Sequence, residues 1–190
     1  HCATMASARL CRAGYSGVEL SRQRIVIIGA TSGIAEHCAR LWARSGTDFV
    51  LVGRDGAKLG RVADDLRVRS PQSSVETLVL DFLDVNAITH LAQQLAQTRV
   101  DIVLIAHGDL PLQSACEQDV RVAQAALQIN GVSPALFAEA FAMQLNQQGH
   151  GTLAVIGSVA GDRGRKTNYV YGAAKGLVER YVQGLQHRFA

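Results

Sequence analysis

The sequence predicts an α/β fold: a three-layer, doubly wound parallel sheet with helices on both faces. Short apolar runs rich in β-branched residues alternate with amphipathic stretches of helical spacing. Most of these runs lack polar alternation, as expected for parallel strands that are covered on both faces. The links between runs and stretches are short, which is typical of strand–helix–strand units joined by right-handed crossovers.

Five apolar runs are expected to form the strands, at 25–28, 49–52, 75–80, 100–105 and 152–156. The first two helices are expected over 33–45 and 56–68, since Gly46 and Pro71 follow them. Asp84 is the expected N-cap of a third helix, whose apolar face carries Val85, Ile88, Leu91 and Leu95. Further helices are expected over about 117–130, over 134–147, and from Asn168 to the end of the chain.

Length and composition indicate one soluble domain over residues 23–190. The chain has 190 residues, of which 48% are apolar and 18% charged, enough for one substantial core. Residues 1–22 begin with His1 and have no continuous apolar region, so we interpret them as a tag, an extension or a disordered lead. No apolar run reaches the roughly 20 residues of a membrane span.

Charge and cysteine usage narrow the partners and the compartment. The formal net charge is only +3 and the basic residues are scattered, so no nucleic-acid partner is expected. No pair among Cys2, Cys11, Cys38 and Cys116 has metal-ligand or CxxC spacing. The sequence therefore predicts a reduced, cytoplasmic protein with no metal site.

A glycine turn follows the first strand and leads directly into a helix: Gly29-Ala30-Thr31-Ser32-Gly33-Ile34-Ala35. Such a turn lets the backbone approach a pyrophosphate and directs free helix N–H groups at it. Gly29 permits the turn and Gly33 leaves room for a cofactor, while Thr31, Ser32 and Ile34 complete the expected binding set. The alternative is an ordinary glycine-containing turn. The position after the first strand of a βαβαβ run favours a dinucleotide site.

The second strand ends in Gly53-Arg54-Asp55, where a dinucleotide fold meets the adenosine ribose. The Arg54 guanidinium can hold the 2′-phosphate of NADP(H) in a forked geometry. In the alternative, Arg54 is a solvated surface residue and Asp55 binds the 2′-hydroxyl of NAD(H). We favour NADP(H).

Ser158 follows the fifth strand, and Tyr171 and Lys175 are four residues apart on the last helix, so they share one face. A phenol has a pKa of about 10, and a neighbouring ammonium favours its ionised form. These residue types suit proton exchange at a carbonyl oxygen that Ser158 steadies. Alone, the Tyr–Lys pair is more often a half-buried ring and a solvated charge; the serine and the glycine turn favour catalysis.

From Arg24 onward the sequence resembles the short-chain dehydrogenase/reductase family, a Rossmann-type fold. The resemblance rests on Gly29-(x)3-Gly33-x-Ala35, Asp81, Asn130, Ser158 and Tyr171-(x)3-Lys175. It implies that Asp81 and Phe82 flank the adenine, that Ala106 and Gly108 contact the cofactor, and that Lys175 holds the nicotinamide ribose. It also implies that Asn130 holds a water in a proton relay, although Asn130 taken alone is equally a helix-end or turn residue.

The sequence departs from the family at three places. Ile105-Ala106-His107-Gly108 stands where the family has Asn-Asn-Ala-Gly, and Ala174 replaces a serine before the lysine. The family continues with further strands and a substrate loop beyond the position of Ala190, so we expect a C-terminally truncated fragment. Residues 160–172 resemble the subgroup that includes decaprenylphosphoryl-2-keto-ribose reductases. Their basic residues either meet a phosphate-bearing substrate or form a solvated loop; they are Arg163, Arg165 and Lys166.

The resemblance implies an NADP(H)-dependent oxidoreductase that interconverts the carbonyl and alcohol forms of a small-molecule substrate. A keto-sugar or a lipid-linked sugar is a candidate substrate. The resemblance also implies a homodimer or homotetramer, in which the long last helix pairs with its copy. The alternative is a catalytically incompetent dinucleotide-binding module or redox sensor. A purely structural partner protein is a third reading.

Overall fold

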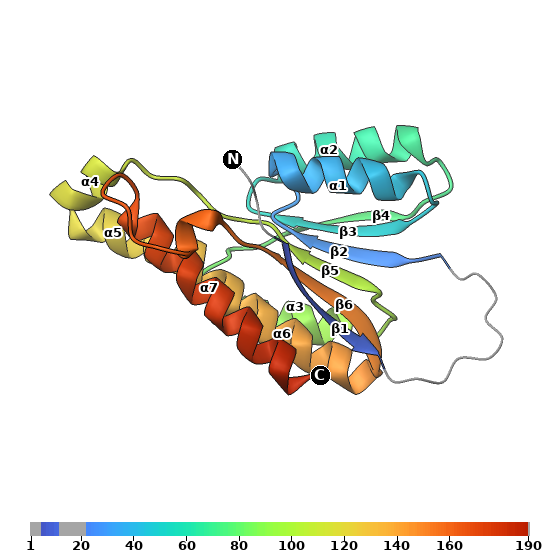
Figure 1. Cartoon of the computed structure of the whole chain (residues 1–190). Coiled ribbons are helices and arrows are strands. Elements are labelled where there is room, and N and C mark those ends of the chain that lie inside the picture. The colour runs from blue at the N-terminus through green and yellow to red at the C-terminus, as the bar shows by residue number, and fades with distance from the viewer. Residues whose placement is uncertain (1–4, 12–21, 190) are drawn as a thin grey trace.

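The computed structural model describes residues 5–11 and 22–189, and its centre is a six-stranded sheet. Five strands are parallel: β2 (Arg24–Ile28), β3 (Asp48–Gly53), β4 (Val75–Val79), β5 (Ile102–Ile105) and β6 (His150–Ile156). The strand order is β1-β6-β5-β2-β3-β4, so the chain winds outward from β2 in one direction and then in the other. This arrangement confirms the predicted doubly wound α/β fold (Figure 1).

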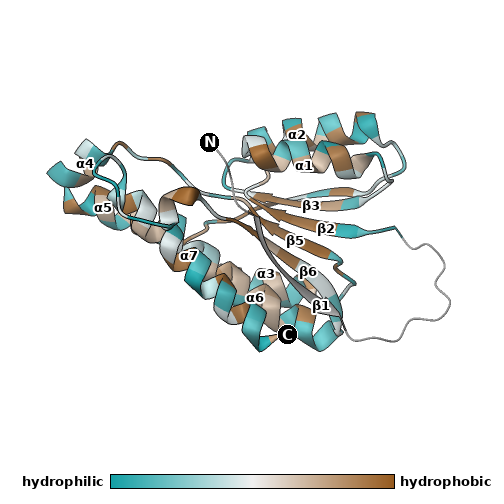
Figure 2. Ribbon diagram, viewed as in Figure 1, coloured by the Kyte–Doolittle hydropathy of each residue, from teal (hydrophilic) through white to brown (hydrophobic). Residues whose placement is uncertain are grey.

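Helices cover both faces of the sheet (Figure 1). One layer holds α1 (Gly33–Ala43) and α2 (Gly56–Arg69), and the other holds α3 (Val85–Leu95), α6 (Ser133–Gln148) and α7 (Tyr169–Arg188). Alternate residues of β2 point to opposite faces of the sheet. Ile25 and Ile27 pack in the core between the sheet and α1 and α2, and Val26 and Ile28 pack in the core on the side of α3, α6 and α7. Figure 2 shows the result as apolar strands between helices whose outward faces are polar.

The strand β1 (Met5–Cys11) lies at the edge of the sheet and pairs antiparallel with β6, from Met5 opposite Ile156 to Cys11 opposite His150. It belongs to the segment 1–22, which the sequence alone indicates to be a tag, an extension or a disordered lead; residues 1–4 and 12–21 of that segment lie outside the described residues. Because the β1–β6 pairing joins two distant parts of the chain, no local sequence pattern predicts it. The five-stranded parallel core is complete without it.

The helix expected over about 117–130 is instead three consecutive segments. They are α4 (Gln113–Gln118), α5 (Val120–Leu127) and a π-helical turn η1 (Gln128–Val132). Asp119 ends α4 with extended backbone and caps α5, since its carboxylate accepts from the Arg121 N–H. The predicted cap of α3 is confirmed: Asp84 Oδ1 accepts from the N–H groups of Asn86 and Ala87. Among residues 5–11 and 22–189, no helix is long and apolar enough to cross a membrane.

Candidate active site

The turn after β2 needs a glycine at position 29. Gly29 has φ +83°, which is left-handed backbone, and its N–H donates to the Val52 carbonyl oxygen at 2.8 Å. A Cβ at this position would lie 2.5 Å from the His107 backbone nitrogen and 2.7 Å from its Cβ. The turn after β2 therefore presses against the end of β5, and the two strand ends share one edge of the sheet.

The N-terminus of α1 is open. The Ser32 hydroxyl oxygen accepts from the Ala35 N–H at 3.3 Å, while the N–H groups of Gly33 and Ile34 have no acceptor among the described residues. Both residues are exposed, and a Cβ on Gly33 would meet nothing within 4 Å. Free N–H groups and the positive end of the helix dipole make this turn suited to an anion such as a phosphate.

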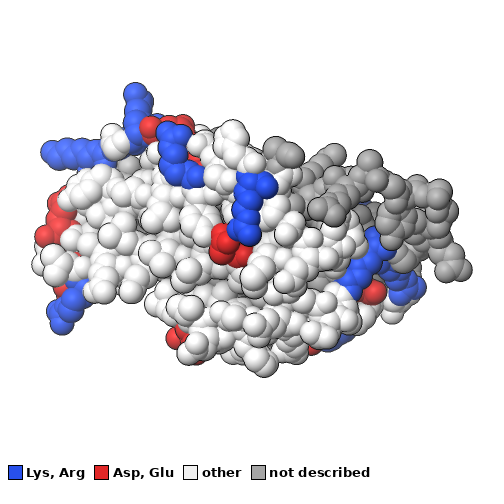
Figure 3. Space-filling model, turned by 90° about the horizontal axis from the view of Figure 1, so that it is seen from below, with Lys and Arg blue, Asp and Glu red and all other residues white. Residues whose placement is uncertain are grey.

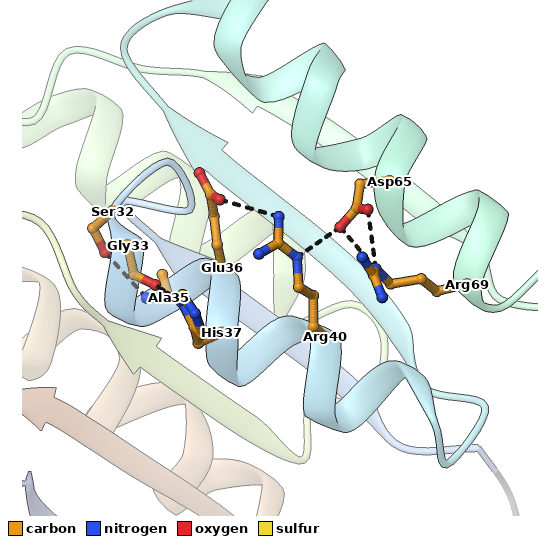
Figure 4. Close-up of polar contacts among 8 residues, drawn as sticks. All are labelled: Ser32, Gly33, Ala35, Glu36, His37, Arg40, Asp65 and Arg69. Atoms are coloured by element: carbon orange, nitrogen blue, oxygen red, sulfur yellow. Dashed lines mark hydrogen bonds and ion pairs between the residues drawn. The ribbon is translucent and has the colours of Figure 1, made fainter.

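Polar contacts along α1 hold that helix in place (Figure 4). The Arg40 Nε donates to Asp65 Oδ2 at 2.8 Å, and Arg69 of α2 donates to the same carboxylate at 3.0 Å. The hydrogen bonds from Arg69 and then Arg40 lower the pKa of Asp65. Next to the glycine turn, His37 Nδ1 lies 2.7 Å from the Gly33 carbonyl oxygen. The start of α1 is thus fixed relative to α2 while its first N–H groups stay free.

A cavity of about 410 Å³ opens at the carboxyl ends of β2, β3 and β5. This volume is within the range of small-molecule and cofactor sites. It brings together residues from the segments that follow β2, β4 and β5, from the end of β3 through the start of α2, and from the turn at 128–132: Gly29, Thr31, Ser32, Gly53, Arg54, Asp55, Lys58, Phe82, His107, Gly108 and Ile129. Six of the residues expected to bind a cofactor lie in that set.

The other expected cofactor residues lie outside the cavity lining. Gly33 and Ile34 form the first turn of α1, as described above. Ala106 is buried at the end of β5 and its N–H donates to the Ile28 carbonyl oxygen at 2.8 Å. Asp81 is exposed, and its carboxylate accepts from the Leu83 N–H at 3.0 Å, so it shapes the loop that carries Phe82.

Arg54 and Asp55, the two competing residues after β3, have different surroundings. Asp55 Oδ1 accepts from the Lys58 N–H at 3.0 Å and so caps α2; this hydrogen bond is the main reason that the pKa of Asp55 is lowered. Arg54 is exposed and makes no hydrogen bond or ion pair with any residue that the structure describes. The guanidinium is the group left free for a ligand.

Tyr171 and Lys175 occupy the first turns of α7. Lys175 Nζ lies 5.9 Å from the centre of the Tyr171 ring, and it donates to the Ile156 carbonyl oxygen at 2.9 Å. The lysine is only 4% exposed, and this burial lowers the pKa of its ammonium. The contact with Ile156 ties α7 to the end of β6. The predicted shared face of these two residues is present.

Asn130 is fully buried within η1. Its Oδ1 accepts from the Asp109 N–H at 2.8 Å, and its Nδ2 donates to the Ala126 carbonyl oxygen at 2.9 Å. A Cβ on Gly108 would lie 2.8 Å from Asn130 Oδ1 and 3.9 Å from Lys175 Nζ. A side chain at position 108 would therefore collide with the asparagine and approach the lysine, and a glycine keeps that space free.

Ser158 lies two residues after the end of β6 and is the N-cap of a single 3₁₀ turn, η2 (Val159–Gly161). Its hydroxyl oxygen accepts from the Ala160 N–H at 3.2 Å, and no hydrogen bond joins it to Tyr171 or Lys175 in the described chain. Ser158 instead lines a separate cavity of about 130 Å³ between β6 and α7. The structure thus groups Tyr171, Lys175 and Asn130, and places Ser158 on the adjoining turn.

Small residues set how closely that turn approaches α7. A Cβ on Gly172 would lie 2.6 Å from the Ala160 carbonyl oxygen, and a Cβ on Gly161 would lie 2.9 Å from the Gly176 backbone nitrogen. Backbone therefore meets backbone between η2 and α7, with no side chain in between. The packing holds the segment with Ser158 against the helix turns with Tyr171 and Lys175.

The sequence leaves two interpretations of His107 open: a contact with substrate or cofactor, or an ordinary packed or surface residue. It is 6% exposed, and its ring lies 4.5 Å from the Phe82 ring and 5.3 Å from the Phe137 ring, centre to centre. Nε2 lies 2.9 Å from Ser133 Oγ. Burial, and then the charges of Lys175 and Arg54, lower the pKa of His107 to about 3. The only signal in the sequence was its departure from the family pattern. In the described chain, no group of three His, Cys, Asp or Glu residues is arranged to hold a metal ion.

Comparison with known proteins shows that the chain is similar to short-chain dehydrogenases and reductases. The family model of the short chain dehydrogenases matches residues 23–190. An uncharacterized oxidoreductase of Staphylococcus saprophyticus is 29% identical over 175 residues, which are 91% of this chain and 74% of the relative. Dehydrogenase/reductase SDR family member 7B of Xenopus laevis is 28% identical over 177 residues, and the match covers 90% of this chain and 55% of that protein.

Solved structures show the same likeness. The bulky-bulky ketone specific alcohol dehydrogenase from Comamonas testosteroni superposes with a TM-score of 0.79 at 26% identity, over 87% of this chain and 67% of that one. A short-chain dehydrogenase from Sphingobium yanoikuyae in complex with NADPH superposes with a TM-score of 0.74 at 29% identity, over 88% of this chain and 65% of that one.

Proposed function

The chain belongs to the short-chain dehydrogenase family, and on this premise we propose that it is an NADP(H)-dependent oxidoreductase that interconverts a carbonyl and an alcohol. The observation that carries the proposal is the buried Lys175 ammonium, which lies 5.9 Å from the centre of the Tyr171 ring. It is close to Gly108, which lines the same cavity as Gly29. Proton transfer and cofactor binding then take place at adjoining parts of one sheet edge.

Four residues have proposed roles in the reaction. In the reducing direction the Tyr171 hydroxyl donates its proton to the carbonyl oxygen, and in the oxidising direction it takes the proton back. Ser158 steadies that oxygen, Lys175 holds the nicotinamide ribose, and Asn130 holds a water that returns protons from solvent. The nicotinamide supplies or accepts the hydride when it is bound.

The residues present fit a dinucleotide. Gly29 lacks the Cβ that would collide with His107, so the turn can form, and α1 offers the free N–H groups of Gly33 and Ile34 to a pyrophosphate. The preference for NADP(H) over NAD(H) is supported by Arg54, which has no partner among the described residues, and by Asp55, whose carboxylate is engaged in capping α2. The likeness to an NADPH-bound dehydrogenase agrees with this preference.

For the substrate we propose a keto-sugar or lipid-linked sugar of the kind handled by the decaprenylphosphoryl-2-keto-ribose reductase-like subgroup. The support is the loop between Ser158 and Tyr171. Its three basic side chains are exposed and have no ion-pair partner among the described residues; they are Arg163, Arg165 and Lys166. A phosphate on the substrate would supply the missing negative charge.

The setting of the enzyme is part of the same proposal: a single domain over residues 23–190 that acts in the cytoplasm as a homodimer or homotetramer. Exposed apolar side chains on α5, η1, α6 and α7 support self-association, among them Leu127, Val132, Met143 and Leu177. Figure 3 shows a face where basic and acidic side chains lie in small separate groups, without a continuous basic surface. That distribution favours a small-molecule partner over a nucleic acid.

The test is Tyr171→Phe in the full chain, with oxidation of NADPH followed by its absorbance over a panel of ketones and keto-sugars. We expect turnover to fall by about 10²–10⁴-fold, the typical contribution of a general acid, while NADPH binding is kept. Tyr181→Phe is the matched control, because that hydroxyl lies on a later turn of α7 and donates to Glu139 of α6. Undiminished turnover in Tyr171→Phe contradicts the proposal. NADPH binding without turnover on any carbonyl by the unchanged protein favours the binding module or redox sensor.

A further inference from the structure

The segment that joins β5 to α4 is fixed at both ends to elements of the candidate active site. Its first residue, Asp109, donates its N–H to Asn130 Oδ1 at 2.8 Å. At its other end Gln113 Oε1 accepts from the Val170 N–H at 3.2 Å, and Figure 1 shows α4 at the same end of the molecule as the start of α7. Residues 109–113, which we call the leucine segment, therefore link η1 to the first turn of α7.

Between its two anchors the leucine segment carries two large apolar side chains that a ligand can reach. Leu110 is 56% exposed and Leu112 is 76% exposed, whereas Pro111 between them is half-buried. The carboxylate of Asp109 accepts from the Leu110 N–H at 2.8 Å, so it is engaged with the backbone of the segment itself. The accessible surface of the segment at both leucines is therefore aliphatic.

Neither leucine belongs to the packing of this corner of the molecule. The start of α7 packs on α4 and α5 through a small separate core of Cys116, Ala126 and Val170. Leu110 and Leu112 lie outside that core. A single exposed leucine is ordinary, but large apolar side chains that gather beside a polar site mark a binding surface.

Exposed apolar side chains also stand next to the proposed catalytic groups. Tyr169 precedes the anchor residue Val170 and lies two residues before Tyr171, and it is exposed. Val159, which follows Ser158, is exposed as well. The segments that hold the catalytic side chains are thus bordered by apolar surface after β5, after β6 and at the start of α7.

The leucines are close in the chain to both anchors. Leu110 follows the residue that binds Asn130, and Leu112 precedes the residue that binds Val170. Neighbouring Cα atoms are about 3.8 Å apart, and the whole leucine segment spans at most about 14 Å. A substrate with its carbonyl at the Tyr171 hydroxyl therefore needs only a short extension to reach the segment.

We propose that Leu110 and Leu112 bind an apolar portion of the substrate and so select substrates with an aliphatic chain beyond the reacting carbonyl. The inference rests on the proposed function, in which the carbonyl lies at Tyr171 and a phosphate meets the basic loop before α7. It narrows the proposed substrates to amphipathic ones. The two leucines touch no reacting atom and act as specificity residues, through the burial of hydrocarbon.

The experiment measures binding, so it does not depend on turnover. Straight-chain methyl ketones from 2-butanone to 2-nonanone are titrated onto the full chain saturated with NADP⁺, which has no hydride to give, and NMR yields each dissociation constant. The test variant carries Leu110→Gln and Leu112→Gln together, which replaces aliphatic carbon by an amide of similar length. Val68→Gln is the control, because Val68 is an exposed apolar residue of α2, in the other helical layer. Binding of NADP⁺ is measured first in every variant.

We expect each added methylene to tighten binding by about 2- to 4-fold in the unchanged protein and in Val68→Gln, until the chain has passed the segment. The double variant should keep the dissociation constant of 2-butanone and lose most of the dependence on chain length. A merely structural effect would weaken all the ketones alike.

Three results overturn this inference alone when NADP⁺ binds: no binding of any ketone, no dependence on chain length in the unchanged protein, or the same dependence in the double variant as in Val68→Gln. If the unchanged protein binds neither NADP⁺ nor NADPH, the proposed function fails with it.

Discussion

The space for a side chain on Gly29 is filled by His107: a Cβ there would meet its backbone nitrogen at 2.5 Å. The turn after β2 and the end of β5 touch at a point that only a glycine allows. Gly33, four residues later, has open space around it. The two glycines of the same turn therefore differ: Gly29 lets the turn pack against the end of β5, and Gly33 leaves the open space that the proposed cofactor would occupy.

Alanine substitutions separate these two roles. Gly29→Ala combines a left-handed φ with a backbone clash and should lower the free energy of unfolding by about 2 kcal/mol or more. Gly33→Ala should leave that free energy nearly unchanged and weaken NADPH binding, because the methyl group enters the open space. Urea unfolding and calorimetric titration measure the two effects. Gly46→Ala, with φ +69° and nothing within 4 Å, isolates the cost of the backbone angle, about 1 kcal/mol. Equal stability of all three variants is incompatible with this account.

The contact between α7 and η2 gives a second pair. Gly172→Ala places a methyl group 2.6 Å from the Ala160 carbonyl oxygen, so we expect a loss of about 1–3 kcal/mol in stability. Turnover should fall by more than the unfolded fraction explains, since the turn with Ser158 shifts away from Tyr171. Gly184→Ala, on the same helix with open space around it, should instead raise stability by about 0.5–1 kcal/mol. If Gly172→Ala proves as stable as Gly184→Ala, the close packing is not as described.

Cofactor preference should depend on Arg54. Arg54→Ala is expected to raise the dissociation constant of NADPH by about 10-fold or more, because charge-assisted hydrogen bonds to the 2′-phosphate are lost. The constant for NADH should change little. Fluorescence titration with both cofactors measures the two.

Asp55→Ala is the matched variant for the same loop. It removes the cap of α2 and should lower the melting temperature without reversing the preference for NADPH. A selective loss of NADH binding in Asp55→Ala would instead assign the ribose hydroxyl to that carboxylate.

Acid should destabilise the fold through His107. Its pKa falls from 6.5 in the unfolded chain to about 3 in the fold, so the unfolded state binds the proton more readily. The contribution to stability is fully present above pH 6.5 and is lost as the pH falls toward 3, about 5 kcal/mol in all. Urea unfolding between neutral pH and about pH 4 measures the slope. His107→Gln, which has no titratable group here, should show a clearly shallower slope than the unchanged protein, and equal slopes would refute the burial of a neutral ring.

Local patterns were sufficient for the five parallel strands and for most helix starts, but not for the edge strand β1. The apolar runs at 25–28 and 49–52 are β-branched and fully buried, so their sequence and their environment agree. Asp84 caps α3 through bonds to residues two and three positions away, which a local pattern can predict. The segment 117–130 kept an apolar period close to that of an α-helix. The break at Asp119 and the π-helical turn that buries Asn130 change that period too little to be predicted from the sequence.

Contacts between distant residues limited the prediction of the site. His107 meets Ser133 and, through it, Phe82, and these positions come together only when α6 and the loop after β4 pack on the end of β5. Lys175 reads as a charged helix residue in the sequence, and its burial follows from contact with the end of β6. Motif spacing could bring Tyr171 and Lys175 to one helix face, but spacing alone could not supply the depth of the lysine or the surroundings of the histidine.

The backbone contact between η2 and α7 also has a consequence for the motions of the molecule. With Ala160 against Gly172 and Gly161 against Gly176, the two segments cannot part by rotation of a side chain; one main chain must lift off the other. Amide protons at positions 172–176 should therefore exchange with solvent only in large-scale opening events, more slowly than those of the loop at 162–168. The temperature at which those slow amides begin to exchange would mark the loss of order at the end of the sheet that carries the proposed active site.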